Sequence, residues 1–118
     1  MITWNNLDTL EAFKNLSKAE RVNIAEAMSG ENGAERVKTY STPMAEGLAY
    51  NYAAKQVDDK VLEDLQKLAD EAQLTEKFEA LYNGEVINTG EKRMVLHHLT
   101  RGQLGEAVNA DGTDKRAF

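Results

Sequence analysis

The chain contains no cysteine, which excludes disulfide bonds and thiolate metal sites and is compatible with a reducing compartment. Its apolar runs extend over only a few residues, too short for a membrane span or for the core of a signal peptide. From these absences we expect a cytoplasmic protein with no membrane partner.

Basic residues are also few. Lys and Arg number 14 against 20 Asp and Glu, giving a net charge of -6, and no long basic block is present to follow a phosphate backbone. We therefore expect no nucleic-acid partner. The 118 residues, 42% hydrophobic and 29% charged, are enough for one ordinary globular domain at most.

The common enzymatic signatures are missing. There is no glycine-rich phosphate loop, no histidine pair at metal-binding helical spacing and no nucleophile elbow. His97 and His98 are adjacent, so on a helix they would point about 100° apart and could not grip one metal ion together. The residues alone thus predict neither a zinc site nor any of the usual catalytic signatures.

The first thirty residues predict a helical hairpin. Ser17 and Glu20 have the spacing of a reciprocal capping box, which would open the second helix, and Gly30 would end it. The apolar residues of the first helix recur at every third position: Leu7, Leu10, Phe13 and Leu16.

Residues 31–57 predict an irregular crossover, because Gly33, Pro43 and Gly47 interrupt any periodicity. The crossover is rich in tyrosine for a solvated linker, so we expect its aromatic rings to anchor it on another surface, which need not belong to this chain. These residues are Tyr40, Tyr50 and Tyr52.

Residues 58–101 predict helices. Asp58 and Asp59 open the strongest one, which should have a solvated charged face on which Glu63 lies four residues before Lys67. Its apolar face comprises Val61, Leu62, Leu65, Leu68, Ala69 and Ala72. A second helix from Thr75 to Tyr82 should bury Phe78 and Leu81 and end at Asn83-Gly84.

A third helix is expected from about Gly90 to Thr100, because Asn88 and Glu91 have capping-box spacing. It would stack Arg93, His97 and Arg101 at i, i+4 and i+8 on one face. Such a basic stripe suits a sugar phosphate or a carboxylate. The alternative, which we favour, is that the stripe pairs with acidic side chains or carbonyl groups at a domain junction.

The remaining residues, 102–118, contain Asp111-Gly112, a hairpin turn signal with too little flanking strand to be stable alone. We expect a hairpin tail that needs support from elsewhere. Residues 1–118 are accordingly predicted to form a single, mainly α segment with a short C-terminal β-hairpin.

The stretch from Gly84 to Arg101 resembles a pattern of the glucose-6-phosphate isomerase (phosphoglucose isomerase) family, Gly-Glu-x-Ile-Asn-x-Thr-Glu-x-Arg-Ala-Val-Leu-His-x-Ala-Leu-Arg. Departures occur at Gly90, Met94 and Leu99-Thr100. The matching residues are Gly84, Glu85, Ile87, Asn88, Glu91, Arg93, Val95, Leu96, His97 and Arg101.

The resemblance implies an N-terminal helical segment of a larger αβα sugar-isomerase architecture that is not in this chain. The family interconverts glucose 6-phosphate and fructose 6-phosphate through an enediol, in glycolysis and gluconeogenesis, without metal or nucleotide. Its catalytic groups lie beyond the matching stretch, so the ten motif residues are interpreted as structural or interface residues.

The resemblance further implies that this chain is a fragment, inactive alone. Its partners would be the rest of the isomerase chain and, in the full-length homodimer, the sugar phosphate substrate. A standalone non-catalytic binding or regulatory module derived from the same segment is the alternative.

Overall fold

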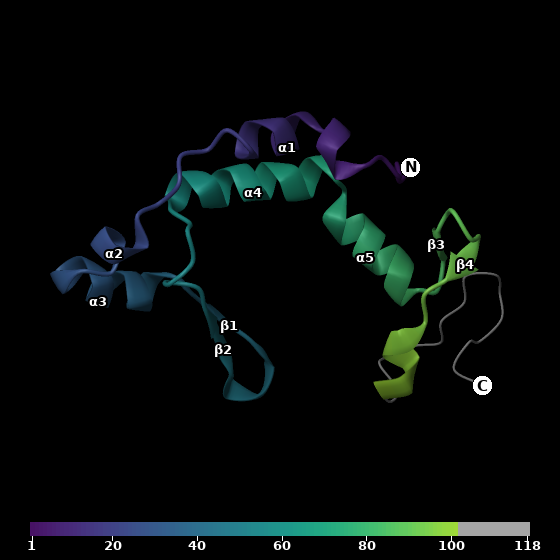
Figure 1. Ribbon diagram of the computed structural model, residues 1–118. Coiled ribbons are helices and arrows are strands. Elements are labelled where there is room, and N and C mark those ends of the chain that lie inside the picture. Colours follow the sequence, from purple (N-terminus) through teal and green to yellow (C-terminus); the bar gives the residue numbers. More distant parts are fainter. Residues whose placement is uncertain (102–118) are drawn as a thin grey trace.

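A computed structural model of the protein describes residues 1–101, which form an open arch (Figure 1). Helix α4 (Asp59–Glu71) is the span, and α1 (Glu11–Leu16) lies along its outer side. An antiparallel hairpin extends from one end of α4 and consists of β1 (Ser41–Pro43) and β2 (Ala49–Asn51).

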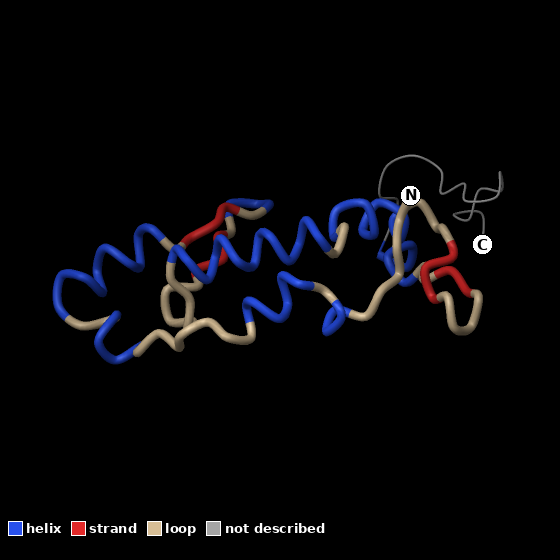
Figure 2. Tube along the Cα trace, turned by 90° about the horizontal axis from the view of Figure 1, so that it is seen from above, coloured by secondary structure: helices blue, strands red, loops and turns tan. Residues whose placement is uncertain are grey.

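The other end of the arch descends through α5 (Leu74–Tyr82) to a second antiparallel pair, β3 (Val86–Asn88) and β4 (Arg93–Met94). From above, α1 and α4 run side by side and the two strand pairs lie toward opposite ends of the molecule (Figure 2). The other elements are η1 (Leu7–Thr9), α2 (Ile24–Ala27), α3 (Gly30–Thr39), η2 (Ala45–Gly47) and η3 (His97–Arg101).

The strongest predicted helix is confirmed as α4. Its N-cap Asp58 accepts a hydrogen bond from the backbone N–H of Val61 at 2.8 Å. On the solvated face, Lys67 Nζ lies 2.7 Å from a carboxylate oxygen of Glu63, at the predicted i, i+4 spacing. The mainly α fold class is therefore confirmed for the described residues.

The helical hairpin predicted for residues 1–30 is only partly correct. The Ser17–Glu20 capping box does not open a helix. Asn23 instead caps α2, because its side-chain oxygen accepts from the N–H groups of Ala25 and Glu26. A capping-box spacing marks a helix start only where the following residues continue the helix, and here residues 18–21 do not.

The irregular crossover predicted for residues 31–57 is wrong for most of its length. Residues 30–39 form α3, and the β1–β2 hairpin follows. Gly33 lies within α3, at a position where the backbone of Met28 leaves no room for a side chain. A Cβ at this position would lie 2.2 Å from the carbonyl oxygen of Met28. The glycine that looked like a helix breaker is therefore a packing requirement between α2 and α3.

The second helix of the 58–101 region is confirmed as α5, but the predicted burial of Phe78 is wrong, since its side chain is 62% exposed. The predicted end at Gly84 is confirmed. Gly84, at φ 73°, donates to the carbonyl oxygen of Leu81, and Glu85 donates to that of Ala80, which is a Schellman-like arrangement.

The third helix, expected over Gly90–Thr100, is absent, and the structure has β3, β4 and η3 there. Asn88 and Glu91 do bond reciprocally, each contact 3.1 Å long. These bonds close the β3–β4 turn instead of opening a helix, and Lys92, at φ 54°, takes a left-handed conformation within the turn. The hairpin predicted for residues 102–118 lies outside the described residues.

Little of this arch is buried. Across residues 1–101, the buried apolar side chains are Leu10, Ala53, Ala72 and Ala80, and no large side chain is fully enclosed. Within the same range, no helix is long and apolar enough to cross a membrane. The apolar stripes of α4 and α5 are therefore only partly covered by the described residues.

Candidate functional site

The ten motif residues follow α5 through the β3–β4 pair to η3. Gly84 is buried at the end of α5, while Ile87, Asn88, Val95 and Leu96 are half-buried. The charged and titratable members are exposed: Glu85, Glu91, Arg93, His97 and Arg101. The geometry is that of a turn and hairpin held in register by the side chains of Asn88 and Glu91.

The predicted basic stripe does not exist as one helical face. Arg93 lies in β4, paired with Asn88, whereas His97 and Arg101 lie at the two ends of the short 3-10 helix η3. The i, i+4, i+8 argument required one continuous α-helix, and β4 interrupts it. The prediction that Arg93, His97 and Arg101 stack on one helical face is therefore wrong.

His98, rather than the motif residue His97, is the histidine that packs. Its ring stacks on Tyr82 with centroids 5.3 Å apart, and Nε2–H donates to the carbonyl oxygen of Tyr82 at 3.2 Å. The buried Nδ1 has no hydrogen-bond partner among the described residues. Sequence reasoning missed this difference, because adjacency alone does not say which of two histidines turns inward.

The three tyrosines of the β1–β2 region form a ladder. The rings of Tyr40 and Tyr52 lie 5.4 Å apart and those of Tyr52 and Tyr50 lie 6.0 Å apart. The hydroxyl of Tyr40 donates to Asp59 at 2.8 Å. Partial burial, reinforced by this bond to a carboxylate, raises the pKa of Tyr40 above its ordinary value.

Arg36 of α3 connects this ladder to the segment that precedes α4. Its guanidinium donates to the carbonyl oxygens of Ala53, Lys55 and Val57, and it lies 4.4 Å above the Tyr40 ring. A planar fork of donors suits such a set of carbonyls in a way that a lysine ammonium does not. The segment that enters α4 is consequently held in one conformation.

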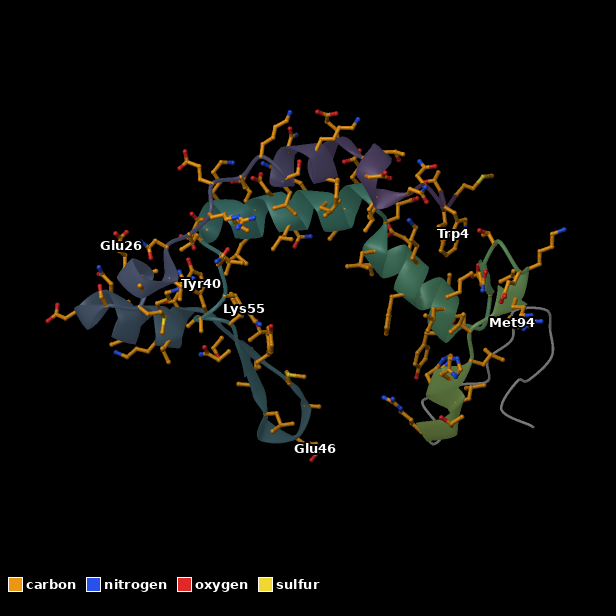
Figure 3. The ribbon with its side chains drawn as sticks, in the orientation of Figure 1. Trp4, Glu26, Tyr40, Glu46, Lys55 and Met94 are labelled. Carbon is orange, nitrogen blue, oxygen red and sulfur yellow. The ribbon has the colours of Figure 1, made fainter. Side chains whose placement is uncertain are left out.

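A groove opens on the concave side of the arch, between the hairpin and α4. Its volume is about 610 Å³. Figure 3 shows Lys55 on this side, beneath the end of α4 from which the hairpin descends. The groove is lined by Thr42, Met44, Tyr50, Tyr52, Lys55, Val57, Leu62 and Leu65.

A second, charged cluster lies on α4 where this helix runs beside α1. Asp64 is 8% exposed and accepts from Lys60 Nζ at 3.0 Å, with Lys67 Nζ 3.6 Å away. The hydrogen bond from Lys60 lowers the pKa of Asp64, and the bond to Glu63 raises the pKa of Lys67. Because the carboxylate is already satisfied by two ammonium groups, we interpret this cluster as structural.

A metal ion would need several ligating side chains in one place. Nowhere in residues 1–101 do three or more His, Asp or Glu side chains gather in that way. The described residues therefore offer no candidate metal centre, and their main surface features are the apolar groove and the Asp64 cluster.

Known proteins of similar sequence show the family of this chain. The family model for phosphoglucose isomerase matches residues 51–117. A glucose-6-phosphate isomerase from Treponema denticola is 51% identical over 120 residues, which cover 98% of this chain and 23% of the relative.

Two further relatives are glucose-6-phosphate isomerases as well. The protein from Treponema pallidum is 46% identical over 100 residues, covering 85% of this chain and 19% of its own length. The protein from Borreliella afzelii is 41% identical over 115 residues, covering 97% and 21%. The chain thus spans about a fifth of the length of the curated relatives that it matches.

Proposed function

The chain belongs to the phosphoglucose isomerase family, and we propose that it serves as the N-terminal segment of a glucose-6-phosphate isomerase. The whole enzyme would interconvert glucose 6-phosphate and fructose 6-phosphate through an enediol, in glycolysis and gluconeogenesis. We further propose a cytoplasmic homodimer that needs no metal or nucleotide.

The single observation that carries this proposal is the family match over residues 51–117. It includes α4, α5 and the ten motif residues. The open arch gives independent support, because a segment that buries so little of its own apolar surface is suited to packing on other domains.

Within that enzyme the segment's role would be structural. Enediol chemistry needs a carboxylate base, a cationic group near the enediolate oxygen and donors for the phosphate. We assign these groups to the larger αβα domains, and none of them to residues of this chain. The motif residues from Gly84 to Arg101 would form the junction with those domains.

The alternative is a standalone binding or regulatory module, and its anion-binding form loses the helical-face argument. It depended on Arg93, His97 and Arg101 sharing one helical face, and these residues occupy two different elements. A sugar-phosphate titration followed by amide shifts over residues 91–102 should therefore show no selective perturbation at millimolar ligand.

A chimera tests the proposal. In it, this chain replaces the aligned segment of the Treponema denticola isomerase, and conversion of fructose 6-phosphate is followed in a coupled assay. We expect turnover by the chimera and none by the isolated chain. Turnover by the isolated chain above background would refute the assignment of all catalytic groups to other domains.

A further inference from the structure

One wall of the concave groove is apolar because alternate residues of the β1–β2 hairpin place their side chains on the same face. Side chains alternate between the two faces of a hairpin, so Thr42, Met44, Tyr50 and Tyr52 share the face turned toward α4. The residues between them are small or polar: Ser41, Pro43, Ala49 and Asn51. One face of the hairpin is thus built to be covered and the other is not.

The wall is nevertheless open to solvent. Met44 is 58% exposed, Tyr50 52% and, across the groove, Leu65 39%. Apolar side chains gain stability when they leave water, and here this chain supplies nothing within residues 1–101 to cover them. A contiguous apolar patch of this kind marks an interaction site more often than a free surface.

The rim of the groove carries one sign of charge. Lys55 is the only Lys, Arg, Asp or Glu among the lining residues, and it makes no ion pair within the described part of the chain. The chain as a whole is acidic, at -6. A lone cation beside an apolar wall is complementary to an apolar segment that carries a carboxylate.

The source of that segment follows from chain length. The curated relatives contain about four-fifths of their length beyond the part matched here. We infer that the groove docks an apolar, carboxylate-bearing segment from that remaining part of the isomerase polypeptide. The inference rests on the proposed function, and it names the surface and the chemistry of the contact.

Hydrogen exchange tests this docking in the chimera defined above. Amides of residues 42–52 should exchange at least about tenfold more slowly in the chimera than in the isolated chain, because covering the groove removes local opening. The aligned hairpin of the intact Treponema denticola enzyme provides a second reading that does not depend on how well the chimera folds. Fast exchange of the hairpin in either intact protein would overturn the inference.

Matched substitutions locate the contact. Met44→Asp, which puts a charge on the wall, and Lys55→Glu, which reverses the rim charge, should each lower the thermal midpoint of the chimera. Val37→Asp and Lys38→Glu are the controls, since both residues are exposed on α3 and neither lines the groove. Equal midpoints for groove and control variants would contradict the docking.

The docking of the groove and the proposed isomerase function can be refuted independently, because hydrogen exchange tests the first and turnover tests the second. An active chimera with an unprotected hairpin would refute the docking and leave the isomerase assignment intact. A protected hairpin in a folded chimera without turnover would support the docking and refute the proposed activity.

Discussion

At the scale of single residues, the fold depends on a few polar side chains that bond to backbone groups. Arg36 binds three carbonyl groups just before α4, and Gln73 accepts from both the N–H and the hydroxyl of Thr3. With so few buried apolar side chains, these bonds fix where the chain turns. Substitutions at such residues should therefore act on local geometry more than on a common core.

Gly33 gives a direct residue-scale prediction. Gly33→Ala should destabilise the α2–α3 corner by about 1–3 kcal/mol, because the new Cβ would overlap the carbonyl oxygen of Met28. Gly90→Ala is the matched control, since its Cβ would meet only the Asn88 side chain at an ordinary 3.7 Å. Urea denaturation measures both, and equal midpoints would show that the corner can relax.

The lowered pKa of Asp64 implies a pH dependence of the free energy of unfolding. Its folded-state pKa is lowered below the ordinary 3.8 by the hydrogen bond from Lys60. The contribution is thus fully present above the ordinary pKa and is lost as the pH falls from there through the folded-state pKa.

The check is a comparison of thermal midpoints between about pH 6 and pH 2.5. The substitution Asp64→Asn should lower the midpoint near neutral pH and flatten its acid dependence. The exposed residue Asp70, changed to asparagine in the same way, is the control. An unchanged acid dependence in the Asp64→Asn variant would contradict the assigned role of the carboxylate.

At the scale of elements, local signals predicted some structures and misled on others. Helix α4 has an acidic N-cap and a continuous apolar stripe, so every local preference agrees. The reciprocal bonds of Asn88 and Glu91 form as predicted, but they satisfy a β-turn as well as a helix start. Only the strand pairing of Val86 with Met94 decides between the two, and capping-box spacing carries no information about that pairing.

Burial was the hardest property to predict. The spacing of Phe78 and Leu81 correctly indicates an amphipathic α5, yet periodicity cannot say what covers the apolar face. Phe78 stays exposed because no described element lies over it. The same limit applies to the candidate site: the motif residues could be recognised in sequence, but their division among β3, β4 and η3 could not.

The contact between α1 and α4 yields an element-scale prediction. The Glu71 carboxylate accepts from the N–H groups of Glu11 and Ala12, at 3.1 and 2.7 Å, and so caps α1 from another helix. Glu71→Ala should destabilise the protein by about 0.5–2 kcal/mol and speed amide exchange in α1.

Glu63→Ala is the matched control on the same helix, because within residues 1–101 Glu63 pairs only with the exposed Lys67. It should change stability by less than about 0.5 kcal/mol. An equal loss of unfolding free energy in both variants would contradict a stabilising role for the capping of α1 by Glu71.

At the scale of the whole molecule, the arch formed by residues 1–101 has an outer side whose charged groups are paired and an inner side whose apolar groove no described residue covers. On the outer side Glu71 closes the contact of α1 with α4, and Asp64 is paired with Lys60. The inner side lies between the β1–β2 hairpin and α5 (Figure 1). The apolar groove lies between the hairpin and α4, and Phe78 of α5 is also exposed. This asymmetry is what a segment of a larger enzyme requires.

The most direct test of this account is the rate of fructose 6-phosphate isomerisation by the chimera of this chain with the Treponema denticola enzyme. We expect a kcat within about tenfold of the parent enzyme, a barrier change below about 1.4 kcal/mol, because the role proposed for the segment is structural and includes no reacting group. A chimera that folds like its parent and shows no turnover would contradict it.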